Sequence, residues 1–379
     1  MADVAITTAA EPDGAPRIAI LDILRGVAIL GILFMNINDM GQSMYASFDD
    51  IRHLGWSASD QVAWWLRAVL ADGTARAMLE MLFGAGMVIL TDRVAAHAAG
   101  WVVLRRYYAR NLILFGFGLV HVFVLLWPGD ILHTYGLAAL IAFAFRRLPA
   151  RGLIAIGLSM AAMQAFGGVI NYVDMRQNAA QIERVVAKQQ AHRTLDASDT
   201  TALKASQERQ VARAKDAAET RRLVAAEDAG RRGTFASWAQ TQWRTFLDLE
   251  RQWLEILFVW EAAATMLIGA GLFKLGVLQG QRSRRWYGVM TVIAYALGGA
   301  LRIFGAYEQT RFDGLVHLSS ATQEVARLTM TLGHIGLIHL LAGTPLGARL
   351  LRPFGAAGRT ALTIYIAQTL ICLWVLYPP

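Results

Sequence analysis

The chain has 379 residues, of which 55% are hydrophobic and 17% are charged. With a mean hydropathy of +0.39, this composition excludes an ordinary soluble globular protein and indicates a polytopic membrane protein. The formal net charge of +8 comes from arginines in short loops between apolar runs, which the positive-inside rule explains without a nucleic-acid partner. The single cysteine, Cys372, excludes an intrachain disulfide.

Apolar runs follow one another along most of the chain and predict nine membrane-spanning helices. The amphipathic segment 57–70 lies on the membrane surface, or forms a tenth, re-entrant span. The alternating pattern of a membrane β-barrel is absent, so the predicted fold class is an all-α, polytopic transmembrane bundle of nine to ten spans. The predicted spans are 19–38, 74–91, 109–127, 131–145, 151–171, 254–273, 286–305, 323–342 and 360–377.

The basic residues predict the orientation of the chain. With the N-terminus inside, four inner loops carry most of the arginines, and the short outer loops hold little beyond Arg52, Arg76 and Arg311. We therefore expect a multi-pass protein of a bacterial inner membrane with a cytoplasmic N-terminus and, because nine is odd, a periplasmic C-terminus. The basic residues of the inner loops are Arg93, Arg105, Arg106, Arg110, Arg146, Arg147, Arg151, Lys274, Arg282, Arg284, Arg285, Arg349, Arg352 and Arg359.

Residues 174–233 interrupt the apolar pattern with a polar segment rich in Ala, Gln, Arg, Glu and Asp. Residues 194–199 predict a turn and an N-cap between two helices, and this helical hairpin is too polar to bury a core of its own. The tryptophans and phenylalanines of 234–253 are typical of a membrane interface. We thus predict N-terminal transmembrane helices (1–173), an extramembrane periplasmic hairpin with an interfacial aromatic helix (174–250) and C-terminal transmembrane helices (251–379). The hairpin is a solvated spacer, a lid or a partner-binding arm.

The first predicted span contains Asp22 and Arg25 near one end and Asn36 near the other. An arginine inside a spanning helix costs roughly 2.5–3.5 kcal/mol on insertion scales, so it needs an explanation. Either Arg25 binds an anionic group of a ligand near the cytoplasmic face, or it pairs with Asp22 or extends to the membrane interface.

Three further groups are candidates for chemistry. Asp130 follows a Pro-Gly turn and lies three residues before His133, on the same helical face; an Asp that orients a His suits a general base or proton relay, and the alternative is a capping Asp beside a structural His. His53 lies in the first outer loop. Glu261, inside the sixth predicted span, should face the bundle interior and either pair or stay protonated.

Metal-ligand patterns are absent from the sequence. His334 and His339 are five residues apart and therefore lie on different helical faces, and no HExxH or CxxC element occurs. We predict no metal site. The small-residue stretch 298–300 permits helix association, and hence a homodimer, without specifying one.

Four motifs in order resemble the YeiB-like bacterial inner-membrane proteins, the domain of unknown function numbered four-eighteen. They are LDILRGVAILGI at 21–32, LFGAG at 82–86, GDILHTY at 129–135 and GRTALTIY at 358–365. The last motif contains Arg359, the final basic residue of the inner loops. The resemblance extends from about residue 17 to 376.

The first helix is also similar to that of transmembrane acyltransferases, which take acyl-CoA from the cytoplasmic side and modify a sugar on the far side. In the acyltransferase-3 pattern an arginine, here Arg25, precedes a catalytic histidine, and Asn36 occupies that histidine's place. The heparan-glucosaminide acetyltransferases resemble this chain in carrying Asn there and using a histidine within a His-x-x-Trp element, which His53 matches. This resemblance implies binding roles for Arg25 and Asn36 and a catalytic role for His53.

The leading hypothesis is therefore a transmembrane acyltransferase-like protein embedded in the lipid bilayer. It takes acyl-CoA as co-substrate and needs no metal; His53, or His133 with Asp130, deprotonates a sugar or lipid acceptor. Arg25, Asn36, Glu261 and Arg359 are the candidate binding residues. Two alternatives remain open: a transporter of a small anionic or amphipathic solute, and a non-catalytic membrane scaffold.

Overall fold

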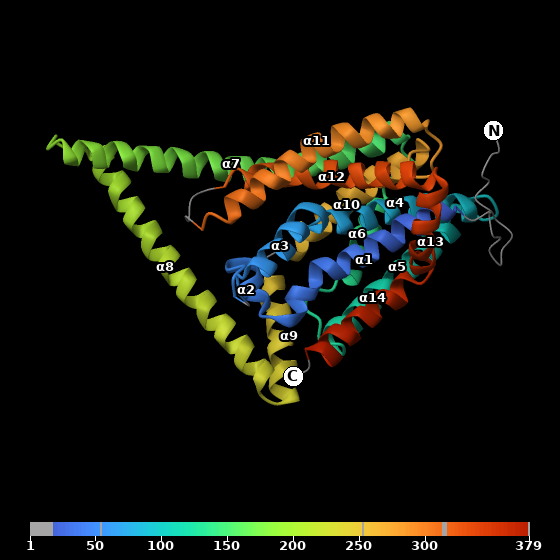
Figure 1. Ribbon diagram of the computed structural model, residues 1–379, viewed down its shortest axis with the longest axis horizontal. Coiled ribbons are helices and arrows are strands. Elements are labelled where there is room, and N and C mark those ends of the chain that lie inside the picture. The colour runs from blue at the N-terminus through green and yellow to red at the C-terminus, as the bar shows by residue number, and fades with distance from the viewer. Residues whose placement is uncertain (1–17, 54, 252–253, 313–316, 378–379) are drawn as a thin grey trace.

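The computed structural model describes residues 18–53, 55–251, 254–312 and 317–377, and every regular element in these ranges is a helix (Figure 1). The predicted all-α class is confirmed. The elements are α1 (Ala19–Gly41), α2 (Met44–Asp49), α3 (Ala58–Leu66), the π-helix η1 (Arg67–Ala71), α4 (Thr74–Ala95), α5 (Gly100–Phe123), α6 (Leu132–Phe143), α7 (Ala150–Gln190), α8 (Ala197–Arg232), α9 (Phe235–Arg251), α10 (Leu254–Lys274), α11 (Arg284–Gln309), α12 (Ser319–Ala342), α13 (Pro345–Arg359), α14 (Ala361–Thr369) and the π-helix η2 (Leu370–Leu376).

Six helical segments in the described part of the chain are long and apolar enough to cross a membrane, and the bent pair 345–359 and 361–376 makes a seventh if it is one span. The other two predicted runs also fall on helices. However, α5 carries Arg105, Arg106 and Arg110, and α6 has 12 residues, which give about 18 Å of a ~30 Å hydrocarbon core. The chain is a multi-pass membrane protein with about six helices that meet the criteria for a span.

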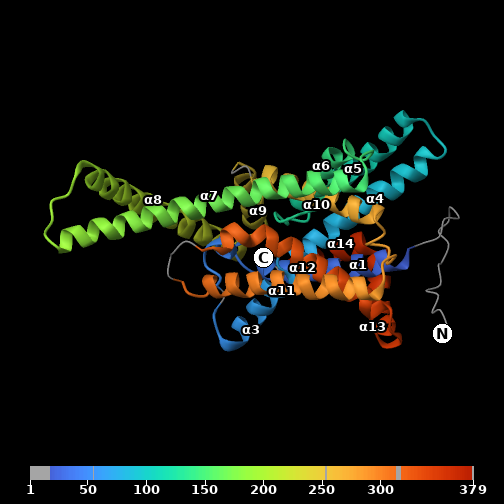
Figure 2. The ribbon, with the colours of Figure 1, turned by 90° about the horizontal axis from the view of Figure 1, so that it is seen from above.

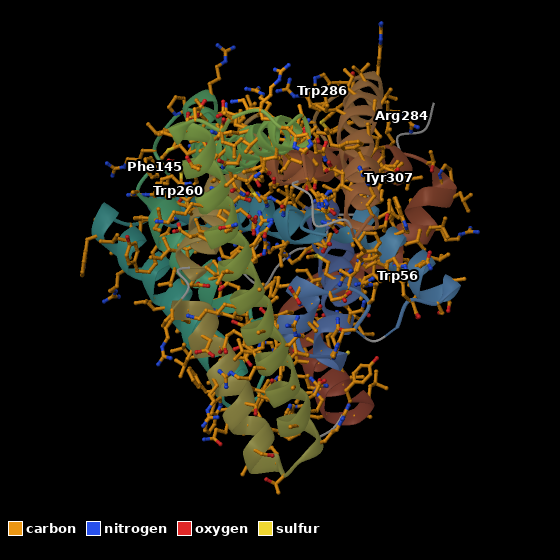
Figure 3. The ribbon with its side chains drawn as sticks, turned by 90° about the vertical axis from the view of Figure 1, so that its left-hand side faces the viewer. Trp56, Phe145, Trp260, Arg284, Trp286 and Tyr307 are labelled. Atoms are coloured by element: carbon orange, nitrogen blue, oxygen red, sulfur yellow. The ribbon has the colours of Figure 1, made fainter. Side chains whose placement is uncertain are left out.

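Large apolar side chains on the outer helices face away from the bundle, as contact with lipid requires. Met163 of α7 and Val292 of α11, for example, are 65% and 69% exposed. Figure 3 labels Trp260, Trp286 and Tyr307, which are also at least partly exposed. Aromatic and aliphatic groups on this surface make the lipid bilayer a direct partner of the protein.

The bundle is organised around α10, which packs against α4, α6 and α7. Small side chains allow this central position, because Ala262–Ala264 are completely buried and the backbones approach closely. A Cβ atom on Gly84 of α4 would overlap the carbonyl group of Met266 in α10. The same argument applies to α1 and α13, where a Cβ atom on Gly26 would overlap the carbonyl group of Phe354.

The two ends of the bundle differ in charge, and we name them the basic end and the arm end. The predicted inner loops, which connect α4 to α5, α6 to α7, α10 to α11 and α12 to α14, meet at the basic end with the start of α1 (Figure 2). There Lys274 donates hydrogen bonds to the carbonyl groups of Arg146 and Leu148. The end of α1 and the starts of α4, α6, α10 and α12 lie at the arm end.

We call residues 174–232 the arm. Helix α7 continues without a break past residue 173, so the predicted boundary there is a change in composition and not in backbone. The chain turns at 191–196, and α8 begins with a capping box between Asp196 and Asp199. In Figure 1, α7 and α8 diverge from this turn as a V instead of packing side by side. The returning end of α8 contacts α2.

Candidate functional site

A cavity of about 840 Å³ lies at the arm end of the bundle. This volume is within the usual range of small-molecule sites. Its wall comes from the ends of α1, α4, α6, α9, α10, α11 and α12, together with α2 and the turn before α6. Because these helices all end or begin here, the cavity lies at the end of the bundle from which the arm projects.

The turn before α6 places one carboxylate between two imidazoles. Asp130 Oδ1 lies 2.6 Å from His121 Nδ1, and Asp130 Oδ2 lies 2.9 Å from His133 Nδ1. The Asp130 side chain also accepts from the His133 backbone N–H at 3.0 Å and from the Tyr365 hydroxyl at 3.2 Å. Burial would raise the pKa of Asp130, but the hydrogen bonds from both histidines outweigh it and lower that pKa. The sequence prediction that Asp130 orients His133 matches this geometry.

Local sequence explains why this turn is so compact. Gly118 of α5 leaves room for it, since a Cβ atom there would overlap the His133 backbone nitrogen. Leu126 has φ = 61°, a left-handed conformation that a leucine rarely adopts. Strained residues of this kind concentrate near functional sites.

The other nitrogen of His133, Nε2, lies beside two glutamates of the cavity wall. A carboxylate can only accept hydrogen bonds, so His133 Nδ1 carries the proton shared with Asp130, and in the neutral imidazole Nε2 has the lone pair. This Nε2 lies 3.4 Å from Glu255 Oε2 and 3.8 Å from Glu250 Oε1. It makes no hydrogen bond with the described residues. A fixed imidazole with an open lone pair can act as a general base or as a metal ligand.

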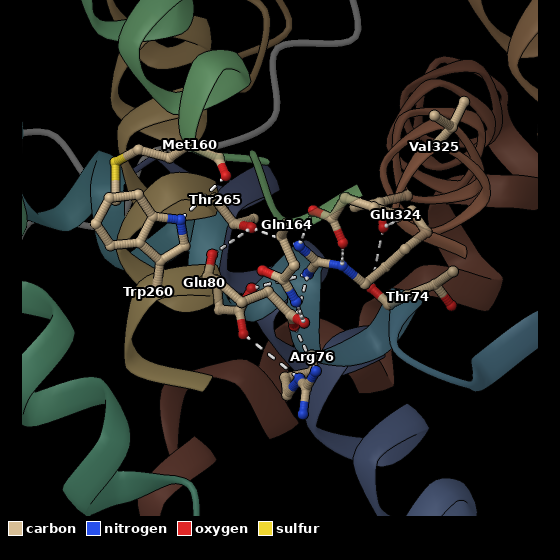
Figure 4. A network of polar contacts seen from close by, with 12 residues as sticks. Thr74, Arg76, Glu80, Met160, Gln164, Trp260, Thr265, Glu324 and Val325 are labelled. Atoms are coloured by element: carbon tan, nitrogen blue, oxygen red, sulfur yellow. Dashed lines mark hydrogen bonds and ion pairs between the residues drawn. The ribbon is translucent and has the colours of Figure 1, made fainter. Parts of the chain in front are cut away.

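A buried charge network closes the inner side of the cavity (Figure 4). Arg327 of α12 binds Glu80 at 3.1 Å and Glu324 at 2.7 Å, and lies 3.3 Å from Glu261. Arg76 of α4 pairs with Glu261 and lies 3.5 Å from Glu80. The expectation that Glu261 faces the interior and pairs is confirmed. Three carboxylates here meet two guanidinium groups.

Four predicted site residues lie outside the cavity lining: Glu261, in the charge network just described, and Arg25, His53 and Arg359. Arg25 pairs with Asp22 at 3.0 Å, which is one of the two alternatives the sequence left open, and donates to the Gly358 carbonyl at 3.4 Å. His53 lies 3.3 Å from Asp228 of α8, and Arg359 is exposed at the end of α13. Of the predicted binding residues, Asn36 does line the cavity.

Sequence reasoning missed several residues of the site. Arg76, expected in an outer loop, is instead inside α4, because the helix begins at Thr74 and its first turn buries that side chain against Glu80 and Glu261. Arg327 and Glu80 also escaped attention, although the argument applied to Glu261, an ionised group inside a predicted span, fits both. The sequence around His121 does not show that it contacts Asp130, because the turn between α5 and α6 brings the two residues together.

Comparisons with known proteins give a family without an activity. Residues 272–379 match a family model described as "Protein of unknown function (DUF418)". The uncharacterized protein YxaH of Bacillus subtilis is 25% identical over 372 residues, 95% of this chain and 82% of YxaH. The uncharacterized protein YeiB of Escherichia coli is 26% identical over 361 residues, 94% of this chain and 83% of YeiB. No solved structure matches the chain.

Proposed function

We propose that this chain, which belongs to the YeiB-like family of membrane proteins of unknown function (DUF418), is an acyltransferase-like enzyme with its acceptor site in the arm-end cavity. One observation carries the proposal: buried Asp130 fixes the imidazole of His133, a residue of the cavity wall. The acceptor is a sugar or lipid with a free hydroxyl or amine group that enters from the arm side.

The proposed step is a base-assisted acyl transfer. His133 Nε2 takes the proton of the acceptor while the acceptor's oxygen or nitrogen attacks the thioester carbon of the acyl donor. The C–S bond then breaks, and the imidazolium returns the proton to the departing thiolate. Asp130 stabilises the imidazolium through Nδ1–H, the role that the carboxylate has in a Ser-His-Asp triad.

The donor in this proposal is acyl-CoA, which approaches from the basic end. Charge supports this half of the proposal, because the arginine-rich loops at that end attract a polyanion. The Arg25–Asp22 pair lies there too, and the Arg25 side chain is 35% exposed. The same loops support a cytoplasmic basic end in a bacterial inner membrane. In this orientation the arm and the C-terminus are periplasmic, and all nine apolar runs are spans.

Acyl transfer in proteoliposomes tests the proposal. Labelled acyl-CoA is supplied on the basic-end side with a panel of hexoses and hexosamines on the other. We expect His133→Gln to lower transfer by about 10²-fold or more. Exposed His97 provides the control, and His97→Gln should retain activity. Full transfer by His133→Gln would overturn the proposal.

The variant His53→Gln tests whether His53 or His133 is the catalytic base. The resemblance to heparan-type enzymes implies that this variant loses activity. The geometry implies that it stays active, since His53 pairs with Asp228 and is not part of the cavity wall.

A second candidate function is transport of a small anionic or amphipathic solute. The specific observation in its favour is the Arg76–Glu80–Glu261–Arg327 network, which joins three helices long enough to span and lies beside the cavity. Transport predicts net solute flux across the proteoliposome membrane without acyl-CoA. Flux that is absent while acyl transfer proceeds would remove this candidate.

A further inference from the structure

We propose that His133, Glu250 and Glu255 bind a divalent cation of the Zn²⁺ class at the wall of the arm-end cavity. One ligand atom from each residue lies within 4.8 Å of the other two. His133 comes from the first turn of α6, whereas the glutamates come from the end of α9 and the start of α10. The site is therefore assembled by folding, and the spacing of these residues in the sequence does not predict it.

The distances suit a metal ion of this size. Zn²⁺ binds imidazole nitrogen and carboxylate oxygen at about 2.0–2.2 Å, so two tetrahedral ligand atoms lie about 3.4 Å apart. His133 Nε2 is 3.4 Å from Glu255 Oε2 and 3.8 Å from Glu250 Oε1. Both distances are near this value, and the two glutamate oxygens lie within 4.8 Å of each other, so side-chain rotation of the glutamates would bring all three atoms into one coordination sphere.

The electrostatics of the cluster require a positive charge between these atoms. His133 is 5% exposed, and its Nε2 lone pair is directed at two carboxylates without a hydrogen bond among the described residues. Glu255 Oε1 is likewise buried without a hydrogen bond there. Lone pairs that face each other in a poorly solvated site repel, so the gap must hold either a cation or a proton.

The surrounding hydrogen bonds favour the cation. Metal-binding histidines usually donate their second N–H to a carboxylate, and metal-binding carboxylates are themselves hydrogen-bonded. Asp130 accepts from His133 Nδ1 at 2.9 Å, and Thr134 donates to Glu255 Oε2 at 3.0 Å. His121 anchors Asp130 from its other side. Imidazole with carboxylates is a ligand set that Zn²⁺ accepts.

Binding of the ion does not depend on the proposed function, whereas a role for the ion in acyl transfer does. With the ion bound, His133 is a ligand, and an acceptor oxygen at the open position would lose its proton more readily through the ion. His133 acts as the base only in the metal-free protein. Metal content is measured without any acyl transfer, so the two proposals can fail separately.

Metal binding by the full chain in nanodiscs tests the inference. The protein is stripped with a chelator and titrated with ZnCl₂ in a calorimeter, and its zinc content is measured by mass spectrometry. We expect one equivalent to bind to the unaltered protein. Glu250→Gln and Glu255→Gln should each weaken binding at least tenfold, and Asp130→Asn should weaken it about 10–100-fold by releasing the imidazole. Glu250 is partly exposed, so its variant should fold even if the others do not.

Glu183 provides the matched control, because it is an exposed glutamate of the arm, and Glu183→Gln should bind zinc like the unaltered protein. Absence of a bound equivalent would overturn the inference and assign a proton to the gap. Equal affinity in the Glu250, Glu255 and Glu183 variants would overturn it as well, since zinc would then bind elsewhere.

Discussion

Arg327 is at the centre of the buried charge network. Its guanidinium group is 2% exposed and contacts Glu80, Glu261 and Glu324, which come from three helices. Breaking a buried ion pair leaves an uncompensated charge and typically costs about 3–5 kcal/mol. We expect Arg327→Ala to destabilise the protein by about that amount in thermal unfolding measured in nanodiscs.

Arg222 offers a matched comparison, since it forms the same i, i+3 pair with Glu219 on the exposed surface of the arm. Water and salt screen this pair, so Arg222→Ala should leave the unfolding temperature almost unchanged. Equal effects of the two substitutions would show that the Arg327 network does not stabilise the bundle.

Single residues were predictable where one rule acts locally. Asp130 and His133 are three residues apart in one turn, and Glu261 is a carboxylate in an apolar run, so the sequence shows both. The cluster in the cavity wall was not predictable in this way, because Glu250, Glu255 and His133 meet only after α10 packs against α6 and α9. Arg25 shows the opposite case. Its charge in an apolar run suggests a ligand site, but the structure pairs it with Asp22 one turn away.

At the scale of elements, the contact between α4 and α10 depends on glycine. Gly84→Ala places a methyl group against the Met266 carbonyl and should destabilise the protein by about 1–3 kcal/mol. Gly86 lies two residues along the same helix, with nothing within 4 Å of an added Cβ atom. Gly86→Ala should keep or raise the unfolding temperature, because alanine favours helix. A lower temperature for both variants would mean that helix packing is not the cause.

The docking of α8 on α2 is expected to depend on pH. Glu227 accepts from the Ser43 hydroxyl at 2.6 Å and the Met44 N–H at 2.9 Å, and burial raises its pKa although these bonds lower it. A carboxyl with a raised folded-state pKa stabilises docking below its unfolded pKa of about 4.3 and loses this contribution as pH rises through the folded-state value. Amide protons of residues 43–46 should therefore be better protected near pH 5 than near pH 8.

Hydrogen exchange, corrected for its intrinsic pH dependence, measures this protection, and Glu227→Gln should reduce the difference. The nearby His53–Asp228 contact also joins this region to α8, so both proteins should carry His53→Gln to remove it. A difference that Glu227→Gln leaves intact would contradict the role of Glu227.

Most helices were predictable because apolar runs and caps are local signals. The predicted turn at 194–199 falls at the capped start of α8. The course of the arm was not predictable, since the uninterrupted α7 and the anchoring of α8 by Glu227 depend on contacts between residues far apart in the chain.

For the whole molecule, the orientation is the first quantity to measure. Cys372 is buried, so a Cys372→Ala background allows single reporters: Gln210→Cys in the arm and Arg285→Cys at the basic end, both exposed positions. In spheroplasts of a bacterial host, a membrane-impermeant maleimide should label the arm reporter at once and the basic-end reporter only after lysis. The reverse pattern would place the arm in the cytoplasm.

Hydropathy predicts nine spans, whereas six or seven helical segments in the described structure are long and apolar enough to cross a membrane. The difference arises from α5, α6 and the 80° bend before α14. Charge placement was more informative than span counting, because the predicted inner loops do meet at one end of the bundle.

The central claim is that a substrate enters the hollow beside His133 from the arm side. A density map of the protein in nanodiscs, recorded with acyl-CoA and acceptor sugars, tests it most directly. We expect an open cavity with non-protein density in contact with His133 Nε2. Side chains packed across that space, with no density beside the imidazole of His133, would contradict substrate entry at this site.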